Sequence, residues 1–344
     1  VILSLNLCHG IARLKRKRLL LLQCHLQKPK KLSGVLELMK RLLLTTVSLL
    51  MTLNVLAQNE KVASVNNMPN AFTSDSQRIV FQSHVKSQAG KYTSQLLSMK
   101  LNGSDVRQEV VAGKKLGWPE FTANGKKAAL FAEVNGNYDL LVVNMAKANN
   151  LSEFTSVQRI TTHEKEDFFA SWSPNEEQIA FYSHRKEPAQ IYVINQDGSN
   201  VKNLSNNSAR ESDPDWSSQN QITFQSDLAG NNDIWVMDEK GNNRKNLTDH
   251  PSQDHFGDWS PDGEHIVFSS DRDGDEDLYI MAKDGTKLRQ LTNGEGIDHW
   301  PLWSPDGKTI TFARVINGWG NVYTIHANGK FETKLTENRS YLMN

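Results

Sequence analysis

The chain has 344 residues, with 39 basic and 39 acidic side chains and only two cysteines. The charges are unevenly placed, because residues 1–57 hold ten Lys and Arg but a single acid, Glu37, which leaves 38 acidic and 29 basic side chains in residues 58–344. This acidic balance excludes nucleic acid as an expected partner, since phosphate binding needs clustered Lys and Arg.

Residues 39–57 have the pattern of a secretory signal peptide. Two basic residues precede an apolar run, and the small-residue sequence Val-Leu-Ala stands before Gln58. A membrane anchor is the alternative, but the apolar run is shorter than the roughly 20 residues that span a bilayer. We therefore expect export, cleavage before Gln58, a periplasmic or secreted protein, and no stable membrane insertion.

Residues 1–38 are basic and stand ahead of this signal, where a true N-terminus is expected. We interpret them as an over-extension of the reading frame; the alternative is a basic arm that binds nucleic acid or membrane. Both cysteines, Cys8 and Cys24, lie there, so we expect no disulfide in the exported part.

An aromatic residue recurs in residues 58–344 at intervals of 43 to 51 residues. Each copy is followed by a polar turn such as Ser-Pro-Asp-Gly, and then by an alternating strand that contains Phe. These six positions, called anchors below, are Phe72, Phe121, Trp172, Trp216, Trp259 and Trp303.

Each repeat predicts four short strands. A third apolar strand follows the Phe-containing one, and in every unit except the second a turn with Gly leads to a fourth strand. In units two to six the fourth strand is expected to end at a pair such as Leu-Thr. A sheet of this size has two apolar faces and must stack on copies of itself. The sequence therefore predicts an all-β protein, a six-bladed β-propeller of four-stranded antiparallel blades, as one domain at residues 58–344.

The two best copies of the repeat carry a family resemblance. Residues 259–274 read WSPDGEHIVFSSDRDG, and residues 303–314 read WSPDGKTITFAR. This pattern resembles the TolB-like, WD-type β-propeller repeat, and the resemblance extends over residues 72–336. It implies a propeller in the cell envelope with protein partners there, such as a peptidoglycan-associated lipoprotein. TolB proteins also carry an α/β domain ahead of the propeller, which we expect this chain to lack.

The anchors could be ligand platforms, but we expect them to fill the gaps between neighbouring blades. The Ser-Pro-Asp-Gly sequences are interpreted as β-turns, in which Pro fixes φ and Gly takes the left-handed conformation.

Five residues before the anchor, four units carry an acid. These acids are Asp167, Glu211, Asp254 and Asp298, whereas units one and two have Asn67 and Leu116. Because the first strands of a propeller line its channel, we expect the four carboxylates to converge on one mouth, with His255, His299 and Trp300 beside them. They could bind a cation or a cationic partner segment, or each could cap the turn at which the chain enters the strand.

The loop Asp271–Asp277 opens on the same face. Its alternating acids resemble a calcium loop, but the helix and the distal Glu of an EF-hand are missing, so an acidic hairpin tip is the favoured alternative. We predict no cofactor and leave the metal ligands, if any, open.

Sequence motifs of common enzymes are absent. The chain has no G-x-S-x-G, no P-loop and no H-E-x-x-H. We therefore predict a non-enzymatic, monomeric binding protein whose acidic channel face holds a protein or peptide. The alternative is a metal-dependent polysaccharide lyase of the oligogalacturonate type, for which only His255 and His299 are candidate metal ligands.

Overall fold

The computed structural model describes residues 62–87, 92–111 and 116–338. These residues form β-strands joined by turns and contain no helix. The predicted signal peptide and the interpretation of residues 1–38 lie outside these residues. The described residues contain no helix long and apolar enough to cross a membrane.

The strands follow one another in six groups of four. The first three groups are β1 (Val62–Phe72), β2 (Arg78–Ser87), β3 (Tyr92–Lys100), β4 (Arg107–Gln108); β5 (Leu116–Phe121), β6 (Lys127–Val134), β7 (Asn137–Met145), β8 (Phe154–Arg159); β9 (Asp167–Trp172), β10 (Gln178–Ser183), β11 (Gln190–Asn195) and β12 (Lys202–Asn203). The last three are β13 (Glu211–Trp216), β14 (Gln221–Ser226), β15 (Asp233–Asp238), β16 (Lys245–Asn246); β17 (Asp254–Trp259), β18 (His265–Ser270), β19 (Asp277–Ala282), β20 (Arg289–Gln290); β21 (Ile297–Trp303), β22 (Thr309–Ile316), β23 (Trp319–His326) and β24 (Thr333–Lys334).

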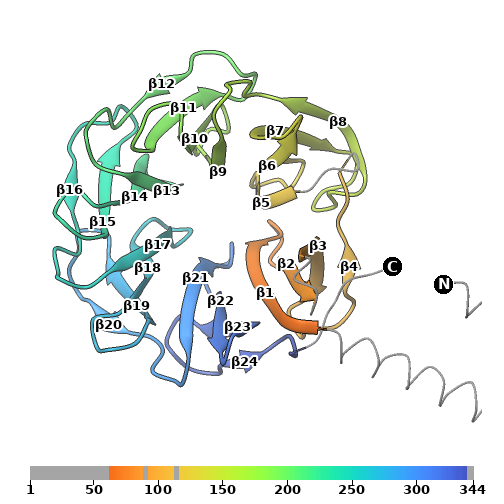
Figure 1. Ribbon diagram of the computed structural model, residues 1–344, viewed down its shortest axis with the longest axis vertical. Helices are drawn as coiled ribbons and strands as arrows, with labels where there is room; N and C mark the ends of the chain where they lie inside the picture. Colours follow the sequence, from red (N-terminus) through yellow and green to blue (C-terminus); the bar gives the residue numbers. More distant parts are fainter. Residues whose placement is uncertain (1–61, 88–91, 112–115, 339–344) are drawn as a thin grey trace, which may run out of the picture. The chain divides into compact units, whose positions relative to one another are not determined.

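Within each group the strands pair antiparallel in chain order, as the sequence predicts. Figure 1 shows the groups as blades around a centre, with the first strands β1, β5, β9, β13, β17 and β21 innermost. All six anchors end a first strand, so the repeat places equivalent residues at equivalent heights along the channel. The fold is an all-β propeller of four-stranded antiparallel blades (Figure 1).

The anchors pack between blades. Trp172 belongs to a core cluster with Phe131 and Leu140 of the second unit and Ile179 of its own, and it is 5% exposed. Trp216 and Trp259 likewise lie in clusters that combine two consecutive units. The interpretation of these anchors as interface-filling residues is confirmed.

The ring closes between units six and one in two ways. Phe72 and Phe81 pack with Val322 and Leu335, which is the side-chain packing that the repeat predicts. In addition, β1 pairs parallel to β23 at Asn66 and Gly320. The amide nitrogen of Gly320 donates a hydrogen bond of 3.0 Å to the side-chain oxygen of Asn66.

One sequence expectation needs correction. The Leu-Thr type pairs follow the fourth strands and do not end them, because these strands are only two residues long in five units. The pair still closes the blade: in unit five Leu291 N donates to Leu278 O at 2.7 Å, and Leu278 N donates to Thr292 Oγ1 at 2.9 Å. Unit two differs, since β8 has six residues.

Candidate functional site in the central channel

The first strands begin at one end of the channel, called the upstream mouth below, and end at the other, where the turns after the anchors lie. The four acids predicted to line the upstream mouth stand at the beginning of their strands and are at most 1% exposed. Each forms an ion pair with an arginine of its own unit: Asp167 with Arg185, Glu211 with Arg244, Asp254 with Arg272, and Asp298 with Arg314.

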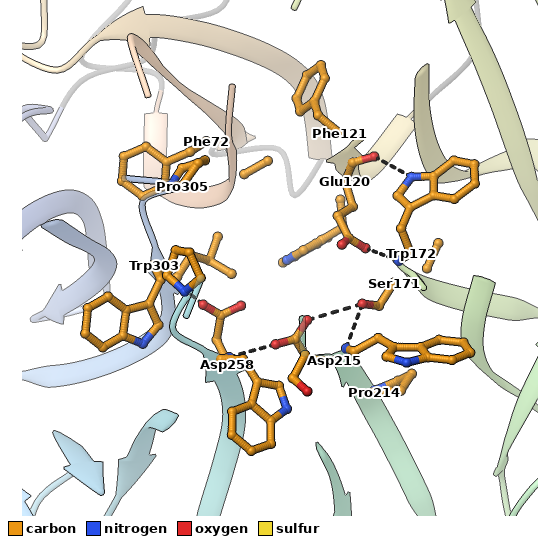
Figure 2. A pocket seen from close by; sticks show the side chains of 18 of the residues that line it. Phe72, Glu120, Phe121, Ser171, Trp172, Pro214, Asp215, Asp258, Trp303 and Pro305 are labelled. Carbon is orange, nitrogen blue, oxygen red and sulfur yellow. Dashed lines mark hydrogen bonds between the residues drawn. The ribbon is translucent and has the colours of Figure 1, made fainter. Parts of the chain in front are cut away.

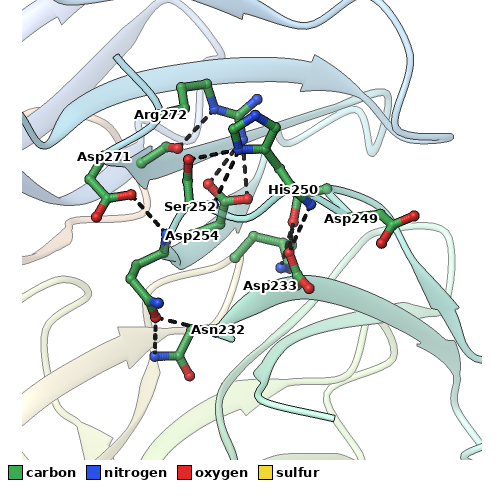
Figure 3. Close-up of polar contacts among 12 residues, drawn as sticks. Asn232, Asp233, Asp249, His250, Ser252, Asp254, Asp271 and Arg272 are labelled. Atoms are coloured by element: carbon green, nitrogen blue, oxygen red, sulfur yellow. Dashed lines mark hydrogen bonds and ion pairs between the residues drawn. The ribbon is translucent and has the colours of Figure 1, made fainter. Parts of the chain in front are cut away.

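Figure 3 shows the pair in unit five, where Arg272 Nη2 lies 2.9 and 3.1 Å from the two carboxylate oxygens of Asp254. Arg272 also lies over the rings of Phe268 and Tyr279, 5.3 and 4.8 Å from their centroids. The other three arginines are placed in the same way over Phe181 and Tyr192, Phe224 and Trp235, and Phe312 and Tyr323.

Buried carboxylates that are paired in this way do not present free negative charge to a ligand. The sequence predicts that the four acids lie at one end of the channel, and the structure places all four at the beginning of their first strands, at the upstream mouth. The expectation that they are open to a cation or a basic partner does not agree with their burial, and units one and two, with Asn67 and Leu116, carry no acid there.

The other three predicted residues do come together. The rings of His299 and Trp300 are 5.1 Å apart, and Phe256 lies 5.4 Å from Trp300 and 5.6 Å from His255. All four side chains are half-buried. They form a patch of rings that spans units five and six beside the channel.

Each of these histidines has one polar partner. His299 Nδ1 lies 2.7 Å from Glu276 Oε1, and His255 Nδ1 lies 3.1 Å from Gln225 Oε1. Burial lowers the pKa of His255, although the nearby carboxylate of Glu276 opposes this change. His255 is therefore neutral near pH 7.

The acidic loop Asp271–Asp277 has mostly structural contacts. Asp271 Oδ1 accepts a hydrogen bond of 2.8 Å from Gln253 N, at the start of β17 (Figure 3). Asp277 Oδ1 accepts one of 3.1 Å from Thr292, and burial raises the pKa of Asp277 to about 6. Asp273 and Asp275 are exposed, and one carboxylate oxygen from each of Asp273, Asp275 and Asp277 lies within 4.8 Å of the others. These three are the residues that a metal ion could use.

Beyond the mouth, a repeated bulge turns side chains toward the channel. Three residues before the anchor, five first strands have a residue with positive φ: Trp118 (40°), Phe169 (50°), Asp213 (53°), Phe256 (57°) and Trp300 (50°). Positive φ is uncommon for such bulky residues, and the strand pairing shifts register there.

Four of the five residues are aromatic. Trp118 lies 4.8 Å from Phe169 and 6.2 Å from Trp300, which in turn contacts Phe256. We call Trp118, Phe169, Phe256 and Trp300 the aromatic collar. It joins side chains of four different blades across the channel.

A pocket of about 630 Å³ lies on the far side of the collar. It is lined by the second halves of all six first strands and by the turns after them, and we call it the turn-side pocket. Figure 2 shows Glu120, Asp215 and Asp258 in it, each one residue before an anchor, with their carboxyl groups turned toward a common space.

These carboxylates connect neighbouring blades. Glu120 accepts a hydrogen bond of 2.9 Å from Trp172 N, Asp215 one of 2.7 Å from Trp259 N, and Asp258 one of 2.7 Å from Trp303 N. In unit three a serine takes the same position: Ser171 Oγ accepts from Trp216 N at 2.9 Å and donates to Asp215 at 3.2 Å. Each bond fixes the next anchor in the ring.

No arginine, lysine or histidine of the described residues lines this pocket. The pKa values of Glu120 and Asp258 are raised well above the usual range, mainly by burial and to a smaller extent by the neighbouring Asp215 carboxylate. Burial raises the pKa of Asp215 to about 6. Sequence reasoning missed this site, although an acid directly before the anchor in three units was a visible signal.

Comparison with known proteins supports the fold. A family model described as the TolB beta propeller domain matches residues 258–344. No curated protein matches the sequence. A solved structure of TolB from Acinetobacter baumannii is 16% identical with a TM-score of 0.58, and the match covers 78% of this chain and 62% of that one.

Two enzyme structures are also similar. An oligogalacturonate lyase in complex with manganese is 15% identical with a TM-score of 0.55, and the match covers 79% of this chain and 78% of the lyase. A puromycin-hydrolyzing peptidase of Mycobacterium tuberculosis is 12% identical with a TM-score of 0.57, and the match covers 81% of this chain and 53% of the peptidase. At these identities the likeness concerns the fold alone.

Proposed function

We propose that this chain, a TolB-like β-propeller, is a non-enzymatic binding protein of the periplasm or the cell exterior that holds a protein or peptide partner at the upstream mouth of its channel. The similar TolB structure and the signal-peptide pattern at residues 39–57 support a role in the cell envelope.

One observation carries the proposal: half-buried rings gather around the upstream mouth. His255, Phe256 and His299 belong to units five and six, and Phe168 of unit three packs against His184 at 6.3 Å. Aromatic residues are enriched in the cores of protein interfaces, because they bury a large area at little entropic cost.

Charge favours a basic partner segment. Asp273 and Asp275 are exposed at the same end of the channel, and residues 58–344 are acidic as a whole. Such a field steers a basic surface toward the mouth and weakens as salt is added.

Capture of the partner tests the proposal. The full chain is used as bait in an envelope extract, and the bound protein is identified and its affinity measured. The variant His255→Ala with His299→Ala is expected to weaken binding about 10-fold or more. The matched control is His265→Ala with His326→Ala, which removes two exposed histidines away from the mouth and should leave binding unchanged. Equal binding by all three proteins would contradict the proposed docking site.

The polysaccharide lyase is the competing function. The observation in its favour is that the rings of His255 and His299 both contact Phe256, with ring centroids 5.6 and 6.4 Å away. The similar lyase structure holds manganese. Release of unsaturated sugar from pectic oligosaccharides, abolished by a chelator and by the same double variant, would replace the binding proposal by this one.

A further inference from the structure

The turn-side pocket gathers acidic side chains without an internal cationic partner. Glu120, Asp215 and Asp258 face a common space (Figure 2), and Glu176 and Asp213 also line the pocket. Since no cationic side chain of the described residues lines it, a positively charged ligand is what would stabilise these carboxyls in their ionised form.

Two of these carboxyl groups have an oxygen that no anchor N–H occupies. Glu120 and Asp258 each use one oxygen to accept an anchor N–H, through Oε2 and Oδ2 respectively. Their second oxygens can accept hydrogen bonds from a cation. Burial raises the pKa of all three carboxyls, which a bound cation would reverse.

A second, independent observation is the side chain of Asn70. It lines the same pocket and is only 4% exposed, yet neither its amide oxygen nor its amide nitrogen has a hydrogen-bond partner. The equivalent positions of the other five units are Pro119, Ala170, Pro214, Gly257 and Pro301, so the fold itself does not require an amide there. A buried amide without partners costs about 1–3 kcal/mol unless a ligand or water satisfies it.

The pocket is also apolar around these polar groups. The aromatic collar bounds it on the side of the upstream mouth, and Pro119, Pro214, Pro301 and Leu302 belong to its wall. Aromatic faces attract organic cations, and the volume of about 630 Å³ suits a small molecule or one long side chain.

We propose that the turn-side pocket binds an organic ammonium group carried on an aliphatic chain, with Glu120, Asp215 and Asp258 as the anionic partners, Asn70 as a hydrogen-bond partner and the aromatic collar against the carbon atoms. The chemistry is shared by a free amine and by the lysine side chain of a peptide. The site lies at the opposite end of the channel from the proposed partner mouth, so either proposal can fail without the other.

Calorimetric titration of the full chain tests the site. The probes are cadaverine, choline, the peptide acetyl-Gly-Lys-Gly-amide, neutral 1-pentanol and calcium chloride. We expect at least one of the ammonium probes to bind with a Kd below about 1 mM and 1-pentanol not to bind. Binding by cadaverine or choline alone identifies a free amine as the source, whereas tighter binding of the peptide identifies a lysine side chain.

Variants locate the binding. Asp215→Asn with Asp258→Asn should lower the affinity for the ammonium probe about 10-fold or more. Glu120→Gln and Asn70→Ala should each lower this affinity several-fold. Asp273→Asn with Asp275→Asn removes the same charge from the exposed loop and should change affinity less than twofold. Melting curves show that each variant is folded.

Three results would overturn the proposal. The first is the absence of binding by every ammonium probe. The second is equal weakening by the exposed-loop control, which would indicate only long-range attraction. The third is calcium binding that no ammonium probe displaces and that Asp215→Asn with Asp258→Asn abolishes, which would make the pocket a site for a bare ion.

Discussion

Two sets of carboxylates stand on the same first strands, five residues and one residue before the anchors. At the upstream mouth, each of the buried acids Asp167, Glu211, Asp254 and Asp298 is paired with an arginine. In the turn-side pocket, Glu120, Asp215 and Asp258 have only backbone N–H and hydroxyl partners. The role of a repeated acid is therefore clear only once its partner is known: the first set stabilises the blades, and the second consists of carboxyl groups without a cationic side chain beside them.

The largest expected effect concerns the upstream set. Arg272→Met should lower the free energy of unfolding by about 3–5 kcal/mol, because it leaves the fully buried Asp254 carboxylate without its counter-charge. Urea unfolding followed by tryptophan fluorescence measures the change.

The control is the double variant Asp254→Asn with Arg272→Met, which removes both charges and should recover most of the lost stability. If Arg272→Met alone is as stable as the parent protein, the upstream acids are not structural and the contrast between the two sets fails.

The pocket set should respond in the opposite direction. Asp215→Asn with Asp258→Asn should raise the free energy of unfolding by about 1–2 kcal/mol at pH 8, because it removes repulsion that the fold tolerates. Asn can still accept the hydrogen bonds of Trp259 N and Trp303 N through its side-chain oxygen.

The sign of the pH dependence follows from the raised pKa values. A carboxyl whose pKa is higher in the folded than in the unfolded state stabilises the protein at low pH, and this contribution is lost as pH rises through the folded value. For Asp215 the window runs from about pH 4, the value of a free carboxyl, to about pH 6. The advantage of the double variant should therefore be small at pH 4 and grow toward pH 8; an advantage that is constant with pH would show that repulsion is not its cause.

The fold could be predicted from the sequence because its signals are local. The anchor, the turn after it and the alternating strand lie within about 12 residues of one another in every unit, and one repeat confirms the next. The Gly turns are an example: Gly285 has a φ of 87°, and a Cβ atom there would come within 2.7 Å of Leu247 O on the preceding blade.

The site was harder to predict because it depends on partners far along the chain. Arg272 stands 18 residues after Asp254, and Arg185 stands 18 after Asp167. In the other two pairs the spacing is 33 and 16 residues, so no single spacing identifies all four. The turn-side pocket has a weaker signal, since Ala71, Ser171 and Leu302 replace the acid in three units. The pocket also depends on which blades face one another across the channel, and this is fixed only when the ring of blades closes.

The smallest expected effect tests whether the position before the anchor also has a structural role. Ser171 is 2% exposed, accepts a hydrogen bond from Trp216 N, and donates one to Asp215. Ser171→Ala should lower the free energy of unfolding by about 1 kcal/mol, because it leaves a buried N–H without a partner. Ser218→Ala, an exposed serine of the same pocket, is the control and should have no effect. Thermal and urea unfolding of both variants measure the difference.

Loss of ammonium binding in Ser171→Ala without loss of stability would mean that this hydroxyl contacts the ligand. The set of polar residues in the turn-side pocket would then extend to a fourth blade.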